Sequence, residues 1–182
     1  MKKILIGTHN QGKFREIAYL ISKKYKKISP IALKIKSPKE TGATFASNSK
    51  LKVKFFSKFV DYPVISDDSG LCIKALGNKP GIHSARLAKK KGGFPEAMRF
   101  LLKKLKKKKD RSATFISCLS FRDLNGKIVS VEGIIKGKIS NKILGKKGFG
   151  FDPIFIPKSE KITFGQMQKK KKKRNGSSIY CF

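Results

Sequence analysis

Apolar and polar residues follow two different periods along the chain, which predicts strands and helices in turn. Residues 3–7 form a short β-branched run that predicts a strand. The apolar residues that follow are spaced as on one face of a helix, expected over about 13–24. That stripe consists of Ile17, Leu20, Ile21 and Tyr25. A second strand is expected over 28–35, with Pro30 near its start.

The middle of the chain predicts a longer helix and then a buried strand. Thr44 is a candidate cap for a helix that runs to about Val60, because threonine oxygens accept hydrogen bonds from first-turn amides. The residues expected to point inward from this helix are Phe45, Leu51, Phe55, Phe56 and Phe59. The apolar run 63–65 predicts a strand that ends at Asp67, with another short strand over 71–76.

The second half of the chain adds an amphipathic helix over 95–105 and a β-hairpin. Asn125-Gly126 is a hairpin turn signal between expected strands over 114–121 and 127–135. Together the elements predict an α/β protein with a strongly twisted, mixed β-sheet flanked by helices.

Asp67 and Asp68 stand where the buried strand is expected to end. Ligands of open α/β sheets bind beyond the carboxyl ends of strands, and neighbouring strand residues point to opposite faces. Only one of the two carboxylates can therefore face a given cleft. Mg²⁺ with a polyphosphate would suit it, because Mg²⁺ takes one or two carboxylates together with substrate oxygens. The alternative is that the pair caps a turn, where Asp is common.

The composition is strongly basic. The 182 residues include 44 Lys and Arg against 11 Asp and Glu, a formal charge of +33. Such a charge points to nucleic acid, a membrane surface or phosphorylated substrates. The lysines recur in short clusters along the whole chain, so the charge by itself favours none of these partners. The length suits one domain, or one domain with two lobes.

The three cysteines, Cys72, Cys118 and Cys181, fit neither a disulfide framework nor a metal-binding spacing. The first two lie in apolar runs and are expected to be core thiols. No secretory leader follows Met1, and no apolar stretch approaches the roughly 20 residues of a membrane helix. We therefore expect a cytoplasmic protein.

Residues 8–13 lie between an expected strand and an expected helix, which is a phosphate-binding layout. The free amides of a first helical turn attract an anion, Thr8 and Asn10 can add hydrogen bonds, and Lys13 adds a charge. The glycine spacing of a Walker A loop is absent. The alternative is an ordinary turn in which Asn10 caps the helix.

Four stretches taken together resemble the Ham1/inosine triphosphatase family over about residues 3–168. They are Thr8-x-Asn10-x-x-Lys13, Asp67-Asp68-Ser69-Gly70-Leu71, Pro80-Gly81-Ile82-x-Ser84-Ala85-Arg86 and Gly148-Phe149-Gly150-Phe151-Asp152-Pro153-Ile154-Phe155. The resemblance implies Mg²⁺-dependent hydrolysis of the non-standard purine nucleotides ITP, dITP, XTP and dXTP to the monophosphate and pyrophosphate. It also implies an elongated two-lobed α/β domain with a nucleotide cleft between the lobes, usually in a homodimer.

The same resemblance implies roles for individual residues. Asp68 would be general base and metal ligand, with Asp67 a second candidate ligand. Phe149 would stack on the purine, for which plain core packing is the alternative. Lys52 would contact phosphate or base, for which a solvated lysine is the alternative. The expected substrate-binding residues are Thr8, His9, Asn10, Gln11, Gly12, Lys13, Lys52, Ser69, Phe149, Gly150, Phe151, Asp152 and Lys172.

Two features depart from the family pattern. Ser47 stands before Asn48 where the family commonly has a Glu near the metal, so that ligand would be lost or supplied by water, Asp67 or Glu40. Residues 169–182 form a lysine-rich tail in place of the family's Ser- or Asp-His-Arg motif and last helix.

The codons that can encode residues 174–182 explain the altered tail. Read one base out of frame, they can contain Glu-Met-Asp-His-Arg-Ser-Ile-Ala, so we expect a one-base slip in the adenine run that encodes residues 169–173. A tail without the His and Arg that read the purine would weaken discrimination against ATP and GTP.

Three alternatives stay open at this stage. A Maf-like nucleotide pyrophosphatase shares the architecture, but the motif at 148–153 argues against it. A catalytically impaired family member would follow from Ser47 and the tail. A basic nucleic-acid-binding protein has only the charge in its favour, since most of the 14 Phe occupy core-like positions. Neither His9 nor His83 has an evident catalytic partner.

Overall fold

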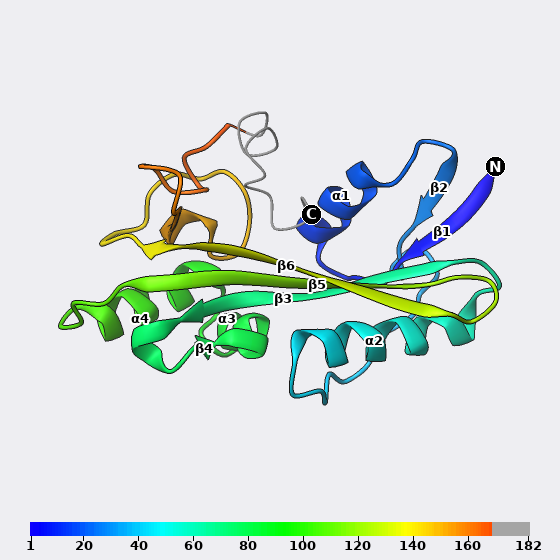
Figure 1. Ribbon diagram of the computed structural model, residues 1–182, viewed down its shortest axis with the longest axis horizontal. Coiled ribbons are helices and arrows are strands. Elements are labelled where there is room, and N and C mark those ends of the chain that lie inside the picture. Colours follow the sequence, from blue (N-terminus) through cyan, green and yellow to red (C-terminus); the bar gives the residue numbers. More distant parts are fainter. Residues whose placement is uncertain (169–182) are drawn as a thin grey trace. The chain divides into compact units, whose positions relative to one another are not determined.

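The computed structural model describes residues 1–168, and Figure 1 shows the order of its elements. The described part contains four α-helices and a seven-stranded β-sheet. The helices are α1 (Gln11–Leu20), α2 (Phe45–Phe56), α3 (Ser84–Lys90) and α4 (Phe94–Leu105). The strands are β1 (Lys2–Ile6), β2 (Tyr25–Ile28), β3 (Val64–Ile73), β4 (Lys79–Pro80), β5 (Ser112–Arg122), β6 (Ile128–Ile139) and β7 (Phe155–Pro157). Short 3₁₀ helices are found at Ser57–Phe59, Lys74–Leu76, Gly81–His83 and Asp152–Ile154.

The sheet is mixed, as the sequence predicts. Its strand order is β2-β1-β3-β5-β6-β7, and β4 pairs with β3 beside this path. β1 is parallel to both β2 and β3, whereas β4 is antiparallel to β3 and β7 is antiparallel to β6. The α/β class with a mixed sheet is therefore confirmed.

The chain divides into two compact units. The first comprises Met1–Asp68 and Ser117–Glu132, and the second comprises Ser69–Ile116 and the chain from Gly133 onward. Strands β3, β5 and β6 each contribute residues to both units. A single family domain ending at residue 168 stays a prediction.

The first unit is built on β1, with α1 and α2 on opposite sides of the sheet (Figure 1). Its buried apolar cluster consists of Leu5, Val53, Phe56 and Val64. Thr44 caps α2 as expected, because its hydroxyl accepts a hydrogen bond from the Ser47 amide at 3.0 Å. The Ser47 hydroxyl in turn accepts from the Thr44 amide at 3.0 Å, which completes a capping box.

Two sequence expectations for the first unit are wrong. Helix α1 ends at Leu20, which is half exposed, because the polar residues after it form a turn rather than a further helical turn. The second strand is Tyr25–Ile28 instead of 28–35. Beyond it, the amides of Leu33 and Ile35 donate to the carbonyl of Pro30 at 3.2 and 2.9 Å, so this apolar stretch is folded into a turn.

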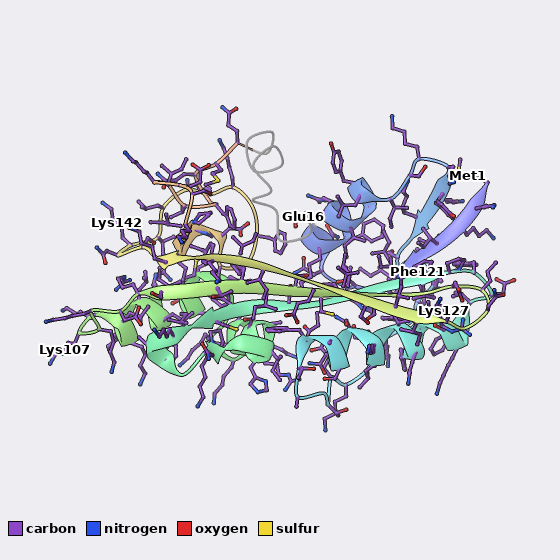
Figure 2. The ribbon with its side chains drawn as sticks, in the orientation of Figure 1. Met1, Glu16, Lys107, Phe121, Lys127 and Lys142 are labelled. Atoms are coloured by element: carbon purple, nitrogen blue, oxygen red, sulfur yellow. The ribbon has the colours of Figure 1, made fainter. Side chains whose placement is uncertain are left out.

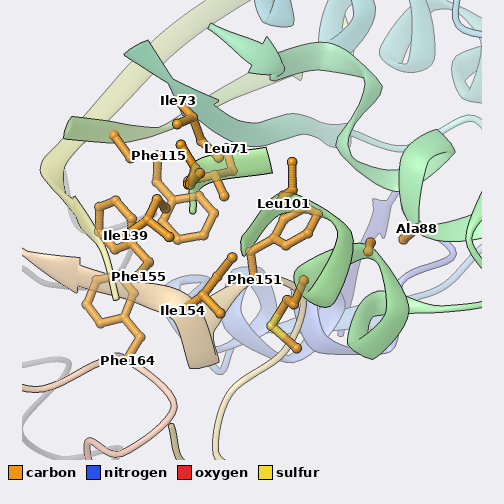
Figure 3. Close-up of a cluster of buried hydrophobic side chains, with 14 of the residues drawn as sticks. Leu71, Ile73, Ala88, Leu101, Phe115, Ile139, Phe151, Ile154, Phe155 and Phe164 are labelled. Carbon is orange, nitrogen blue, oxygen red and sulfur yellow. The ribbon is translucent and has the colours of Figure 1, made fainter. Parts of the chain in front are cut away.

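The second unit holds the larger apolar cluster (Figure 3). Leu101 of α4 and Phe115 of β5 pack in it with the aromatic residues of the C-terminal part. These aromatic residues are Phe151, Phe155 and Phe164, each almost fully buried. The expected placement of most Phe in the core is confirmed for this unit, whereas Phe59 in the first unit is half exposed.

The expected hairpin joins β5 to β6. The Asp123 amide donates to the Lys127 carbonyl at 3.1 Å, and Gly126 has a φ of 84°, a conformation that glycine adopts without strain. The hairpin prediction is therefore confirmed.

Basic side chains are spread over many elements rather than gathered on one. Lys107 follows α4, Lys127 lies in the hairpin turn and Lys142 follows β6 (Figure 2). Of the helices in residues 1–168, none has the length and apolar character needed to cross a bilayer.

Candidate active site

Asp67 and Asp68 lie in the middle of β3, not at the end of a strand as the sequence suggests. Both side chains are buried, and the chain can stay extended because each carboxylate has a partner within the fold. Asp67 Oδ2 is 2.7 Å from Lys13 Nζ, and Asp68 Oδ2 accepts a hydrogen bond from Asn48 Nδ2 at 3.0 Å. The two carboxylates therefore have different partners, as expected for neighbouring strand residues that point to opposite faces.

Gly70 keeps β3 extended beyond the carboxylates. A Cβ at Gly70 would lie 2.1 Å from the carbonyl oxygen of Gly81 and 2.7 Å from Ser84 Oγ. The Ser84 hydroxyl donates to that same carbonyl and accepts from the Leu71 amide at 2.9 Å. Two of the sequence motifs, at 67–71 and 80–86, therefore meet in the second unit through Gly70 and Ser84. Ser69, which is predicted to contact the substrate, is half-buried in β3.

The predicted phosphate loop links β1 to α1. The side chain of Asn10 accepts a hydrogen bond from the Lys13 amide at 3.1 Å, so it caps the helix, as the alternative interpretation proposed. The Asn10 amide donates to Thr8 Oγ1 at 3.3 Å. The capping is compatible with the predicted phosphate contact, because the amides of Gln11 and Gly12 in the first turn have no acceptor within the helix.

His9, in the same loop, holds a neighbouring segment. Its Nε2 lies 2.9 Å from the carbonyl oxygen of Ile35, and its Nδ1 lies 2.5 Å from Ser37 Oγ. Since the Ile35 carbonyl can only accept, Nε2 is the donor in that hydrogen bond. A direct substrate contact by His9 stays a prediction.

Helix α2 presents Asn48 and Lys52 from one face, since residues four apart lie one above the other. Both are buried, and the Lys52 ammonium lies 3.3 Å from Glu40 Oε1. The idea that Lys52 is one more solvated lysine is wrong. Asn48 was not predicted as a site residue, and Glu40 was named only as one possible replacement for the carboxylate that is missing at Ser47.

Burial and neighbouring charges together shift the pKa values of Asp68 and Lys13. Burial raises the pKa of Asp68 to about 6, although Lys52, Lys13 and the hydrogen bond from Asn48 act in the opposite direction. Burial by itself would lower the pKa of Lys13, but the charge and hydrogen bond of Asp67 outweigh it and raise this pKa above its ordinary value. The site therefore contains a firmly charged lysine and a carboxyl group that ionises near neutral pH.

The carboxylates of the site fit Mg²⁺. Within residues 1–168 no group of three or more His, Cys, Asp and Glu side chains is arranged to hold a metal ion. Two carboxylates are close enough to act on each other, because the charge of Glu40 raises the pKa of Asp68. Two are enough for Mg²⁺, which keeps several waters and binds substrate phosphates. Ser47 supplies no carboxylate here, since its hydroxyl completes the cap of α2.

The second unit carries the residues predicted for the base pocket. The Phe149 amide donates to Asp152 Oδ2 at 2.9 Å, and a Cβ at Gly148 would lie 2.0 Å from that same oxygen. Phe149 is half-buried, whereas the Phe151 ring is buried edge-on against Phe94. Core packing therefore accounts for Phe151, and stacking of Phe149 on a base stays a prediction.

Three predictions concern residues outside the described range 1–168. They are the substrate contact by Lys172, the cysteine at Cys181 and the expected frame slip at 169–173. Cys118 is buried as expected, and Cys72 is half-buried.

Known proteins resemble this chain in sequence and in fold. A model of the Ham1 family matches residues 4–177. A dITP/XTP pyrophosphatase of Caulobacter vibrioides is 38% identical over 168 residues, which cover 91% of this chain and 87% of that protein. One of Nostoc sp. is 40% identical over 177 residues, 95% of this chain and 87% of that protein. The solved structure of a HAM1 protein from Coxiella burnetii matches with a TM-score of 0.86 at 31% identity and covers 98% of this chain and 92% of that one.

Proposed function

This chain belongs to the Ham1 family, and on that premise we propose that it hydrolyses dITP, ITP, XTP and dXTP to the nucleoside monophosphate and pyrophosphate. Such a hydrolase of acid anhydrides removes non-standard purine nucleotides from the nucleotide pool. An elongated two-lobed form with the nucleotide in a cleft, a homodimer and a cytoplasmic location belong to the same proposal and rest on the family resemblance.

The observation that carries the proposal is the buried carboxyl group of Asp68 among cationic and amide groups. Lys52 and Lys13 lie near enough to lower its pKa, and Asn48 donates a hydrogen bond to it at 3.0 Å. Without a metal the pKa of Asp68 is about 6, so at neutral pH this group is mostly ionised and can accept a proton. We assign this role to Asp68, with water as the proton donor.

The phosphates are assigned to the start of α1, to Lys13, whose side chain is 15% exposed, and to the buried Lys52. First-turn amides and the positive end of the helix favour a phosphate group there. Lys13 stays charged because of Asp67, so it can stabilise negative charge that develops on phosphate oxygens. We therefore assign Asp67 to the support of Lys13 rather than to a metal.

Mg²⁺ is proposed as the cofactor, held by Asp68 and Glu40. When bound, it would neutralise phosphate charge and lower the pKa of water. The ion pair with Lys52 holds the Glu40 carboxylate next to the lysine. In this arrangement Asp68 and Glu40 would hold the metal, and Lys52 would balance part of their charge.

Recognition of the base is assigned to the turn at 148–152. Phe149 would stack on the purine, and the Gly150 and Asp152 region would line the pocket. Further recognition by Lys172 remains part of the proposal.

The alternatives have less support. The family match and the dITP/XTP pyrophosphatases among the relatives favour the present assignment over a Maf-like enzyme. A nucleic-acid-binding role has the net charge alone, and the basic side chains are distributed over many elements. An impaired enzyme is an outcome of the test below.

The test is product release by the full chain from dITP, XTP, dATP and dGTP, with Mg²⁺ and with a chelator. We expect pyrophosphate and monophosphate, faster from dITP and XTP, and no turnover with the chelator. Release of orthophosphate instead of pyrophosphate would contradict the proposal, and equal turnover of all four nucleotides would contradict its substrate class.

A further inference from the structure

Asn48 makes two hydrogen bonds in opposite senses, and its side chain is fully buried. Its Oδ1 accepts from the Gly42 amide at 2.8 Å, and its Nδ2 donates to Asp68 Oδ2 at 3.0 Å. The Gly42 amide can only donate and an ionised Asp68 can only accept, so the orientation of the Asn48 amide is determined by its two partners.

The two partners belong to separate parts of the site. Asp68 is the assigned base, on β3. Gly42 lies two residues after Glu40, the other assigned carboxylate, in the segment that precedes α2. Asn48 is thus the side chain that connects the segment of Glu40 to Asp68 by direct hydrogen bonds.

We propose that Asn48 is a positioning residue for the reaction, which holds the Asp68 carboxylate with its amide nitrogen and the Glu40 segment with its amide oxygen. This inference rests on the proposed function. Asn48 itself contacts no reacting atom in this role. Through it, the backbone that carries Glu40 and the Asp68 carboxylate are held together before substrate or metal binds, which spares the site a rearrangement during the reaction.

Close contacts around Asn48 restrict the position of its side chain. A Cβ at Gly42 would lie 2.6 Å from Asn48 Oδ1, so a larger residue there would push the segment away. The next residue in the helix, Ser49, lies 2.7 Å from Ser120 Oγ on β5, and Ser120 lies 2.8 Å from Ser130 Oγ on β6. This chain of hydroxyl groups anchors α2 to the sheet beside Asn48.

A purely structural role is the competing explanation, because a buried amide with two satisfied hydrogen bonds also stabilises a fold. Three variants separate the two roles. Asn48→Asp has nearly the same shape and keeps an oxygen for the Gly42 amide, but it replaces the amide donor to Asp68 with a second carboxyl group, which repels the Asp68 charge unless the two share a proton. Asn48→Ala loses both bonds. Ser49→Ala is the matched control, since it removes an equally buried polar group from the same helix.

The measurements are kcat and KM for dITP, the thermal midpoint and hydrogen exchange of the Gly42 amide. For Asn48→Asp we expect a fall in kcat of about 100-fold, a KM within about threefold of the wild type and a protected Gly42 amide. For Asn48→Ala we expect a similar loss of kcat and an unprotected Gly42 amide. Ser49→Ala should lower the thermal midpoint and keep kcat within about threefold.

Several results would overturn the inference. It fails if Asn48→Asp keeps the kcat of the wild type, or if losses of kcat in all three variants simply follow their thermal midpoints. If Asn48→Ala does not fold, Asn48→Asp alone decides. If the wild-type protein is active but its Gly42 amide is unprotected, the inference about Asn48 fails and the proposed function stands. If the wild-type protein releases no pyrophosphate, both fail.

Discussion

Asp67 and Asp68 are consecutive residues of β3, yet their carboxylates have different partners, an ammonium group for Asp67 and a side-chain amide for Asp68. Asp67 Oδ2 lies 2.7 Å from Lys13 Nζ, whereas Asp68 Oδ2 accepts a neutral amide donor at 3.0 Å. The alternation of a strand sends the two side chains to different partners. The same two-residue motif therefore supplies a fixed counter-ion for a lysine and a carboxyl group with a raised pKa.

Neutralising Asp67 should destabilise the fold. Asp67→Asn would leave the Lys13 ammonium without its counter-ion in a buried position, and loss of one partner of a buried ion pair costs about 3 kcal/mol or more. Urea unfolding near pH 7 would measure this. Asp61→Asn is the matched control at an exposed position, with an expected change within about 0.5 kcal/mol. Equal stability of the two variants would contradict the buried ion pair.

Neutralising Asp68 should raise the stability of the fold instead, by an amount that depends on pH. Its pKa is about 6 in the fold against an ordinary 3.8. Between these two pKa values Asp68 is ionised in the unfolded chain but protonated in the fold. The protonated Asp68 therefore contributes its full stabilisation of the fold below about pH 4, and this contribution is lost as the pH rises through 6.

Asp68→Asn removes the buried charge and should therefore raise stability at pH 8, by an amount on the order of 2 to 3 kcal/mol, and change it little at pH 4. Unfolding free energies of both proteins across this range, with a chelator present, give the comparison. A variant that is less stable than the wild type at pH 8 would show that the Asp68 charge is well compensated in the fold.

The loss of the Glu40 carboxylate should weaken the response to Mg²⁺. With Glu40→Gln we expect the Mg²⁺ concentration for half-maximal activity to rise about tenfold or more, because one of two carboxylate ligands is gone. Ser47→Ala should leave that concentration unchanged and reduce stability by about 1 kcal/mol through the lost capping box. The assignment of Glu40 fails if the two variants respond to Mg²⁺ alike.

Gly70 should tolerate no side chain. Gly70→Ala would place a Cβ 2.1 Å from the Gly81 carbonyl oxygen, and we expect a loss of about 3 kcal/mol or more because backbone must move. Gly92→Ala meets no atom within 4 Å and has only the strain of a φ of 84°, about 1 kcal/mol. Thermal unfolding of both variants tests the contact, and a smaller loss for Gly70→Ala would contradict it.

Local signals in the sequence predicted much of this structure. The caps by Asn10 and Thr44 and the Asn125-Gly126 turn follow from side chains that bond to backbone a few residues away, so they can be recognised without tertiary information. The class of fold follows from the alternation of periods. The end of α1 and the second strand were misplaced because apolar residues at 20–35 occupy turns and surface as well as core.

The contacts that complete the site are long-range and were not predictable from spacing. Glu40 and Lys52 form an ion pair, and Asn48 reaches Asp68 over 20 residues of sequence. β3 was expected to end at Asp67 because charges are rare inside strands, and it continues because Lys13 and Asn48 meet those carboxylates. Asp68 was predicted from the family motif, whereas the importance of Glu40 depends on the fold around it.

The most direct test of the account is pyrophosphate release from dITP and XTP, measured beside dATP and dGTP, for the wild type and Asp68→Asn with Mg²⁺. Asp61→Asn, at an exposed position, controls for the same change of one charge. The account predicts selective release from dITP and XTP by the wild type and by Asp61→Asn, and a loss of at least about 1,000-fold in Asp68→Asn. Undiminished turnover by Asp68→Asn would contradict it.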